Sequence, residues 1–211
     1  MCRKLTDTQR QPILENAIKL IGSRGIARTT IRDIAEASGV SVGVIYKYYQ
    51  DKKTLFEACL DHSLKFLSDT ILSASAQSTS LADGMERLAR VSLKFAEEHP
   101  EYIRMYYAIT GSSDPEETLI FARRIEAVSA HEYNALLERA QKAGEIRSDV
   151  SPRILSFCFD NLLMMLHLPG CWPYYDARRK VYCGDADDEE LIKGVVAFAK
   201  SGLGLKEPEG N

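Results

Sequence analysis

Residues 30–52 read Thr-Ile-Arg-Asp-Ile-Ala-Glu-Ala-Ser-Gly-Val-Ser-Val-Gly-Val-Ile-Tyr-Lys-Tyr-Tyr-Gln-Asp-Lys, and this stretch decides the fold. Thr30 and Asp33 form a Thr-x-x-Asp pattern, in which a hydroxyl and an acid satisfy the exposed N–H groups at a helix start. Gly39 can adopt the left-handed conformation that ends a helix without a Cβ clash. Ser41 is a suitable cap for a second short helix. The stretch therefore predicts a helix, a tight turn and another helix.

Two short helices joined by a glycine-containing turn indicate a helix-turn-helix. Ile45 and Tyr49 lie four residues apart and are expected to turn inward, which leaves small residues, hydroxyls and a cation outside. Small groups can lie against base edges in a major groove, while hydroxyls, lysines and helix N-termini bind phosphates. The alternative is an ordinary helical hairpin in a larger bundle, with the tyrosines as packing. The residues predicted to contact DNA are Thr29, Thr30, Ser41, Val42, Gly43, Val44, Tyr46, Lys47, Tyr48 and Lys52.

Residues 8 to about 57 resemble the N-terminal domain of the tetracycline-repressor (TetR) family of bacterial transcription regulators. The resemblance rests on a helix from Ile13 to Gly25, on Thr29–Ala35, on Gly39-Val40-Ser41, and on Gly43, Ile45-Tyr46, Tyr48-Tyr49, Lys52 and Leu55. It implies an all-helical homodimer that binds a palindromic operator and is released by a small-molecule effector. Val42 stands where many members carry a polar or basic residue, and Lys47 where an aromatic or histidine is common.

The charge is distributed unevenly along the chain. The net charge of −3 argues against a nucleic-acid binder, but residues 1–60 hold ten Lys/Arg and six Asp/Glu, and the remainder is acidic. A basic end on an acidic body is expected when only one domain meets phosphate. The composition of 45% hydrophobic and 27% charged residues is typical of a soluble globular protein.

Neither the N-terminus nor any later segment has an apolar run of signal-peptide or membrane-helix type, so a cytoplasmic protein is expected. The five cysteines are scattered and odd in number, which argues against a disulfide framework and for reduced thiols.

Helical periodicity, together with residues that start and stop helices, predicts an all-α chain of about nine helices. We expect a DNA-binding helix-turn-helix domain at 1–52 and a larger ligand-binding and dimerisation domain at 53–211. The first helix is expected at about 8–23, before the two short helices of the motif. The later helices are expected at about 51–75, 80–98, 101–110, 114–143, 152–168 and 188–203.

The helix at 152–168 is apolar almost all round and must be covered on every side. Paired with the helix at 188–203 and with their symmetry mates, it predicts a four-helix dimer interface. The two helix-turn-helix motifs of such a dimer, placed one turn of the DNA helix apart, would then match a palindromic site. The alternative is that these residues form the core of a monomer. The predicted interface residues are Leu155, Phe159, Leu162, Leu163, Leu166, Ile192, Val195, Val196 and Ala199.

The middle helices carry aromatic, thioether and polar groups on mainly apolar faces, as in ligand pockets. Each of these residues is also an ordinary core residue, and that alternative stays open. Residues 169–186 are expected to be a long connection that reaches over a partner subunit, lines a pocket entrance or is simply solvated. The candidate ligand contacts are Phe95, Tyr102, Met105, Tyr106, Phe121, Asn161, Met164, His167 and Trp172.

Two other functions compete with a ligand-controlled repressor. A thiol-based redox sensor on the same scaffold would use Cys171 and Cys183, or Cys59, with the basic triplet 178–180 to acidify Cys183. An enzyme is disfavoured, because the four histidines are dispersed and no phosphate loop, metal-ligand run or nucleophile elbow is present. No cofactor and no metal are expected. The effector, the operator and the regulated genes are not encoded in any motif.

Overall fold

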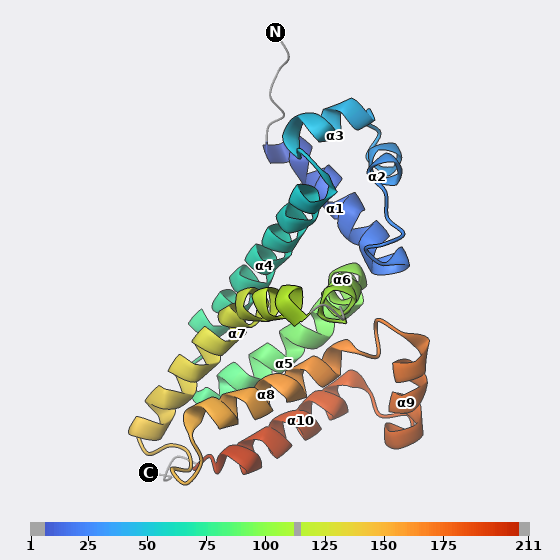
Figure 1. Ribbon diagram of the computed structural model, residues 1–211. Coiled ribbons are helices and arrows are strands. Elements are labelled where there is room, and N and C mark those ends of the chain that lie inside the picture. The colour runs from blue at the N-terminus through green and yellow to red at the C-terminus, as the bar shows by residue number, and fades with distance from the viewer. Residues whose placement is uncertain (1–6, 112–114, 207–211) are drawn as a thin grey trace. The chain divides into compact units, whose positions relative to one another are not determined.

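The computed structural model describes residues 7–111 and 115–206, and within these the chain is all-α with ten helices (Figure 1). The all-α prediction is confirmed, with one helix more than expected. The helices are α1 Asp7–Arg24, α2 Ile31–Ala37, α3 Val42–Tyr48, α4 Lys52–Ala76, α5 Leu81–Glu98, α6 Pro100–Thr110, α7 Pro115–Lys142, α8 Pro152–His167, α9 Pro173–Cys183 and α10 Asp188–Leu203.

The helices form two compact units. The first takes in α1–α3, α4 as far as Phe66, α6 and the start of α7 as far as Ala122. The second takes in the rest of α4, α5, most of α7 and α8–α10. The predicted functional division at residue 52 stays a prediction. The predicted start of the seventh helix at Asp114 lies outside the described residues. Each of the described helices is too short or too polar to span a membrane.

The first unit is built around the isoleucine-rich stripe of α1. Ile13, Ile18 and Ile21 are almost completely buried, and α1 packs against α2 and along α6. Pro12 is the sixth residue of α1, so it lies inside the helix and not in the first turn, where a missing N–H would be tolerated. Within this unit α6 therefore reaches α2 through α1.

Gly22 marks the closest approach of α1 to α6. A Cβ added there would lie 2.7 Å from the carbonyl oxygen of Glu101 and 3.2 Å from Cβ of Arg104. The replacement Gly22→Ala must therefore push the two helices apart. We expect it to lower the free energy of unfolding by roughly 1–3 kcal/mol, the usual cost of overpacking. Urea unfolding measures this, and Gly43→Ala, whose Cβ meets nothing closer than 3.9 Å, serves as the control. An unchanged midpoint for Gly22→Ala would mean that α1 and α6 are not in tight contact.

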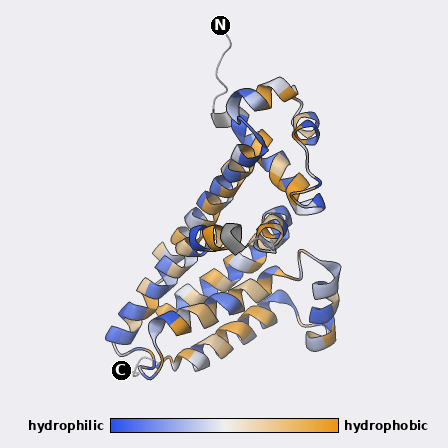
Figure 2. Ribbon diagram, viewed as in Figure 1, coloured by the Kyte–Doolittle hydropathy of each residue, from blue (hydrophilic) through white to orange (hydrophobic). Residues whose placement is uncertain are grey.

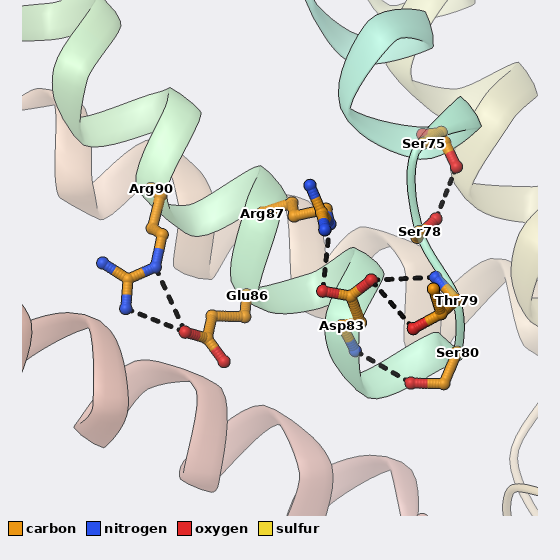
Figure 3. A network of polar contacts seen from close by, with 8 residues as sticks. All are labelled: Ser75, Ser78, Thr79, Ser80, Asp83, Glu86, Arg87 and Arg90. Atoms are coloured by element: carbon orange, nitrogen blue, oxygen red, sulfur yellow. Dashed lines mark hydrogen bonds and ion pairs between the residues drawn. The ribbon is translucent and has the colours of Figure 1, made fainter.

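The second unit has α5 at its centre. α8 and α10 pack on α5 and on each other, and buried residues of α4 and α7 complete the core. Polar contacts fix the start of α5: the Ser80 hydroxyl accepts from the Asp83 N–H at 3.1 Å, and the Asp83 carboxylate accepts from Thr79 and Arg87 (Figure 3). Arg90 binds Glu86 on α5 and Glu189 on α10.

α9 corrects the expected connection at 169–186. The structure has a helix at Pro173–Cys183, and its sequence signals are ordinary: a proline at the first position, Asp176 in the first turn, and Gly184 with φ of 60° after its end. The prediction of a connection without a helix was wrong. None of the α9 residues is buried, so the segment lacks the buried apolar stripe from which the other helices were predicted.

Candidate nucleic-acid interface

A capping box holds the first helix of the motif. The Thr30 hydroxyl accepts from the Asp33 N–H at 3.2 Å, and the Asp33 carboxylate accepts from the Thr30 N–H at 3.0 Å. The Thr30 hydroxyl also donates to this carboxylate at 2.7 Å, and the hydrogen bonds from the Thr30 hydroxyl and N–H lower the pKa of Asp33 below its ordinary value. The Thr-x-x-Asp prediction is confirmed, and it fixes where α2 begins.

Gly39 makes the turn between α2 and α3. Its φ of 65° is in the left-handed region, and the N–H of Val40 closes the turn by donating to the Ala35 carbonyl at 3.0 Å. Ser41 occupies the cap position of α3 with extended backbone, but its hydroxyl makes no capping bond. The cap position is confirmed and the side-chain bond is not.

α3 presents its predicted face. Ile45 and Tyr49 are buried, whereas Val42, Gly43, Tyr46 and Lys47 are exposed. Val44 and Tyr48 are half-buried. The inward and outward division of this short helix therefore follows the predicted pattern, and its outer face is free of large obstructing side chains near its N-terminus.

Thr29 does not fit a phosphate contact. It is completely buried, and its hydroxyl donates to the Gly25 carbonyl at 2.9 Å. It therefore closes the loop between α1 and α2 and is not available to a phosphate. Lys52 braces the same loop, because its Nζ donates to the Ile26 carbonyl at 2.9 Å.

Arg10 is a candidate contact that sequence reasoning missed. Its guanidinium lies 5.3 Å from the centroid of the Tyr48 ring, and Lys47 Nζ lies 5.5 Å from the same centroid. Two cations therefore converge on one tyrosine of α3. The signal was present only as a basic residue early in the first helix, and nothing in its spacing links it to residue 48.

The comparisons with known proteins agree with this geometry. Residues 13–59 match the family model described as bacterial regulatory proteins, tetR family. The HTH-type transcriptional regulator TtgR of Pseudomonas putida is 44% identical over 66 residues, 31% of each chain. The chain belongs to the TetR family of transcriptional regulators. It binds DNA in that role, and the family is not one of enzymes.

Two further matches extend over most of this TetR-family chain. The nucleoid occlusion factor SlmA of Haemophilus ducreyi is 25% identical over 174 residues, covering 79% of this chain and 85% of that protein. The transcriptional regulator FadR of Bacillus subtilis, solved with stearoyl-CoA, superposes with a TM-score of 0.74 at 13% identity, over 92% of this chain and 99% of that one. The second likeness shows the fold alone.

The predicted ligand contacts fall in both units. In the first, Tyr102 and Met105 are buried on α6, where Tyr102 stacks edge-on against Phe66, and Tyr106 and Phe121 are half-buried. In the second, Phe95, Met164, His167 and Trp172 are half-buried, and burial lowers the pKa of His167 to about 4. Asn161 is exposed and donates to the Phe157 carbonyl, so it does not line the interior.

Asp160 was not predicted, yet it shares a side of α8 with Met164 and His167 at helical spacing. Burial and the negative charge of Glu126 raise the pKa of Asp160 to about 6, against a hydrogen bond with Ser129 that lowers it. A carboxylate held at such a cost is a candidate effector contact.

Replacement of Asp160 gives a stability test with a defined sign. Because its pKa rises from 3.8 to about 6 on folding, the charged form destabilises the fold, and this penalty grows between about pH 4 and pH 6. Asp160→Asn is therefore expected to stabilise the protein by roughly 1–3 kcal/mol at pH 7.5 and little at pH 4. Urea unfolding at both pH values measures this, with the exposed Asp185→Asn as control. A larger gain at pH 4 would contradict the sign.

Two of the three cysteines that the thiol-sensor alternative requires are inaccessible. Cys59 and Cys171 are buried, and burial raises the pKa of Cys59 to about 12, which disfavours the reactive thiolate. Cys183 is exposed. However, the cations beside it are engaged elsewhere: Arg179 pairs with Asp188 and Lys180 with Asp176. Among the described residues no cluster of His, Cys, Asp or Glu could hold a metal.

Proposed function

We propose that this TetR-family regulator is a homodimeric repressor that leaves a palindromic operator when a small-molecule effector binds. The observation that carries the DNA part is the exposed face of α3, held in place by the capping box of α2 and the Gly39 turn. On this face Val42, Gly43 and Val44 would lie on base edges. Phosphates would be held by Arg10, Thr30, Ser41, Tyr46, Lys47, Tyr48 and Lys52.

Tyr46 and Lys47 separate two kinds of phosphate contact. Lys47→Ala removes a cation and is expected to weaken binding to every duplex and to reduce the slope of log affinity against log salt by about 0.9. Tyr46→Phe removes only a neutral hydroxyl from an exposed ring, so it should weaken binding about fivefold, a loss of about 1 kcal/mol, with an unchanged slope. Fluorescence anisotropy at several salt concentrations measures both. Equal slopes for wild type and Lys47→Ala would place Lys47 outside the interface.

The homodimer would form through α8 and α10, but through residues other than those predicted. Leu155, Phe159, Leu163 and Leu166 of α8, and Ile192, Val196 and Ala199 of α10, are buried in the core of their own unit. Leu162 and Val195 are half-buried against that core. The residues predicted from sequence therefore belong to the stripe that packs on α5.

A second apolar stripe is exposed on the same two helices. On α8 it consists of Ile154, Phe157, Cys158, Asn161 and Met165, at helical spacing. On α10 the exposed Phe198 is flanked by the small residues Gly194, Ala197 and Gly202, which permit close helix approach. α8 and α10 lie side by side (Figure 1), and both carry hydrophobic positions along their length (Figure 2). We propose this paired face as the dimer interface.

Effector control would act through helices of the first unit, which also contains the helix-turn-helix. α6 carries Tyr102, Met105 and Tyr106 and packs along α1. α4 contributes residues to both units. A ligand that binds more tightly to one arrangement of α6 or α4 would shift the position of α1 and with it α3. The FadR relative was solved with an acyl-CoA, so acyl-CoA thioesters are the first class to screen.

Selection from a random duplex library tests the proposal. It should return a palindrome whose half-site centres are one helical turn of about 10–10.5 base pairs, or a multiple, apart. Two chains should bind each duplex. Recovery of single, unpaired half-sites would contradict the homodimer, and recovery of no consensus would contradict sequence-specific binding. Release of the selected duplex by one compound from a screen, and not by others, tests effector control.

A further inference from the structure

α9 is attached to its unit by one side only. Arg179 pairs with Asp188 at 2.6 Å and donates to the Ala186 carbonyl at 3.3 Å. Tyr175 packs edge-on against Trp172, with 6.2 Å between the ring centroids. The Arg179–Asp188 pair holds the helix beside the start of α10, and no α9 residue is buried.

The opposite side of α9 is an apolar stripe exposed to solvent. Tyr174, Val181 and Tyr182 lie at positions i, i+7 and i+8, with Ala177 and Arg178 between them. The three large side chains are 70%, 82% and 76% exposed. The Arg178 guanidinium lies 4.6 Å from the centroid of the Tyr182 ring, which orders that ring at the surface. An ordered helix with its apolar side outward indicates a surface that a partner covers.

The exposed area indicates which partner. Phe157 and Phe198, at 70% and 69% exposure, present on the order of 140 Å² each, and with Ile154 and Met165 the α8/α10 face presents about 500 Å² of apolar surface. Stable homodimers bury roughly 1,000 Å² or more per subunit, about 65% of it apolar. The four large side chains of the α8/α10 face therefore supply less than this apolar share by themselves. The α9 stripe adds about 400 Å² and brings the total into that range.

The position of α9 in the chain agrees with a second copy as its occupant. α9 connects α8 to α10 directly in the chain, and the Arg179–Asp188 pair holds it at the start of α10, so its stripe belongs to a helix next to the proposed dimer face. We propose that α9 is an arm whose stripe of Tyr174, Val181 and Tyr182 packs against a second copy of this chain and completes the dimer interface. This inference rests on the proposed homodimer through α8 and α10.

The test is the dissociation constant of the purified full-length dimer, measured by sedimentation velocity over a dilution series. Val181→Glu places a charge in the proposed contact and is expected to raise the constant at least tenfold. Leu72→Glu makes the same kind of change at an exposed apolar position of α4 and should alter it less than twofold. Tyr182→Glu should act like Val181→Glu, whereas Tyr182→Phe, which keeps the ring, should not. These positions are exposed, so circular dichroism should show intact monomers.

The outcomes separate this inference from the homodimer itself. An unchanged dissociation constant in both Val181→Glu and Tyr182→Glu, with a monomeric Phe157→Glu, would overturn the arm and leave the α8/α10 dimer standing. The arm is overturned equally if these variants instead lose binding to anionic vesicles or to another protein while dimerising normally. A dimeric Phe157→Glu, or a monomeric wild type at micromolar concentration, would overturn the α8/α10 dimer and the arm with it.

Discussion

Gly43→Glu should abolish specific DNA binding while leaving the fold unchanged. Gly43 is exposed near the N-terminus of α3, and the nearest atom to an added Cβ is 3.9 Å away, so the fold has room for a side chain. Its φ is not positive, and glycine inside a helix is disfavoured relative to most residues by up to about 1 kcal/mol. The carboxylate would, however, be held against base edges and phosphates in the proposed interface. We expect affinity for the selected operator to fall at least 100-fold.

The neutral variant Gly43→Gln separates charge from size. Both side chains fill the same volume, so a loss confined to glutamate is electrostatic, and a loss in both shows that the groove has no room at this position. Thermal unfolding and sedimentation should show both variants folded and as dimeric as the wild type. Wild-type operator affinity in Gly43→Glu would mean that this face of α3 does not enter the major groove.

Phe157→Glu is expected to convert the protein to a monomer. Phe157 projects from the middle of the exposed α8 stripe and is 70% exposed. A charge buried there without a partner costs several kcal/mol at each of two symmetric sites, because an isologous interface uses the residue twice. We expect a dissociation constant raised at least 100-fold and a parallel loss of operator affinity, since each monomer then binds one half-site.

The matched variant for this prediction is Phe159→Leu, two residues away on the buried side of α8. It reduces packing in the core of the unit and should lower the free energy of unfolding by about 1–3 kcal/mol without changing the dimer. The reverse result, a monomeric Phe159→Leu and a dimeric Phe157→Glu, would restore the interface predicted from sequence and contradict the one proposed from the structure.

Local signals in the sequence were sufficient for the DNA-binding helices. The Thr30 and Asp33 capping box, the Gly39 turn and the inward direction of Ile45 depend only on residues a few positions apart, and each is present in the structure. Thr29 was misjudged because its side chain is committed to a loop carbonyl, a contact that the sequence pattern does not specify.

The direction of apolar stripes was less predictable. α8 has two of them, and the one of Leu155, Phe159 and Leu163 is the richer in large aliphatic and aromatic residues because it packs on α5. Sequence alone ranks stripes by hydrophobicity, and the core is the most hydrophobic. The stripe proposed to face a partner is interrupted by Asn161 and Cys158, and only its exposure distinguishes it. Asp160 was missed for a related reason, since its environment comes from α7.

Operator binding by wild-type protein is the most direct measurement of the central claim. The chain would be refolded from denaturant, so that no ligand remains, and titrated against the selected palindrome and a scrambled duplex of equal length at two salt concentrations. The proposed interface predicts at least 1,000-fold tighter binding to the palindrome, with affinities for both duplexes falling as salt rises. Equal affinity for the two duplexes at both salt concentrations would contradict a sequence-specific regulator.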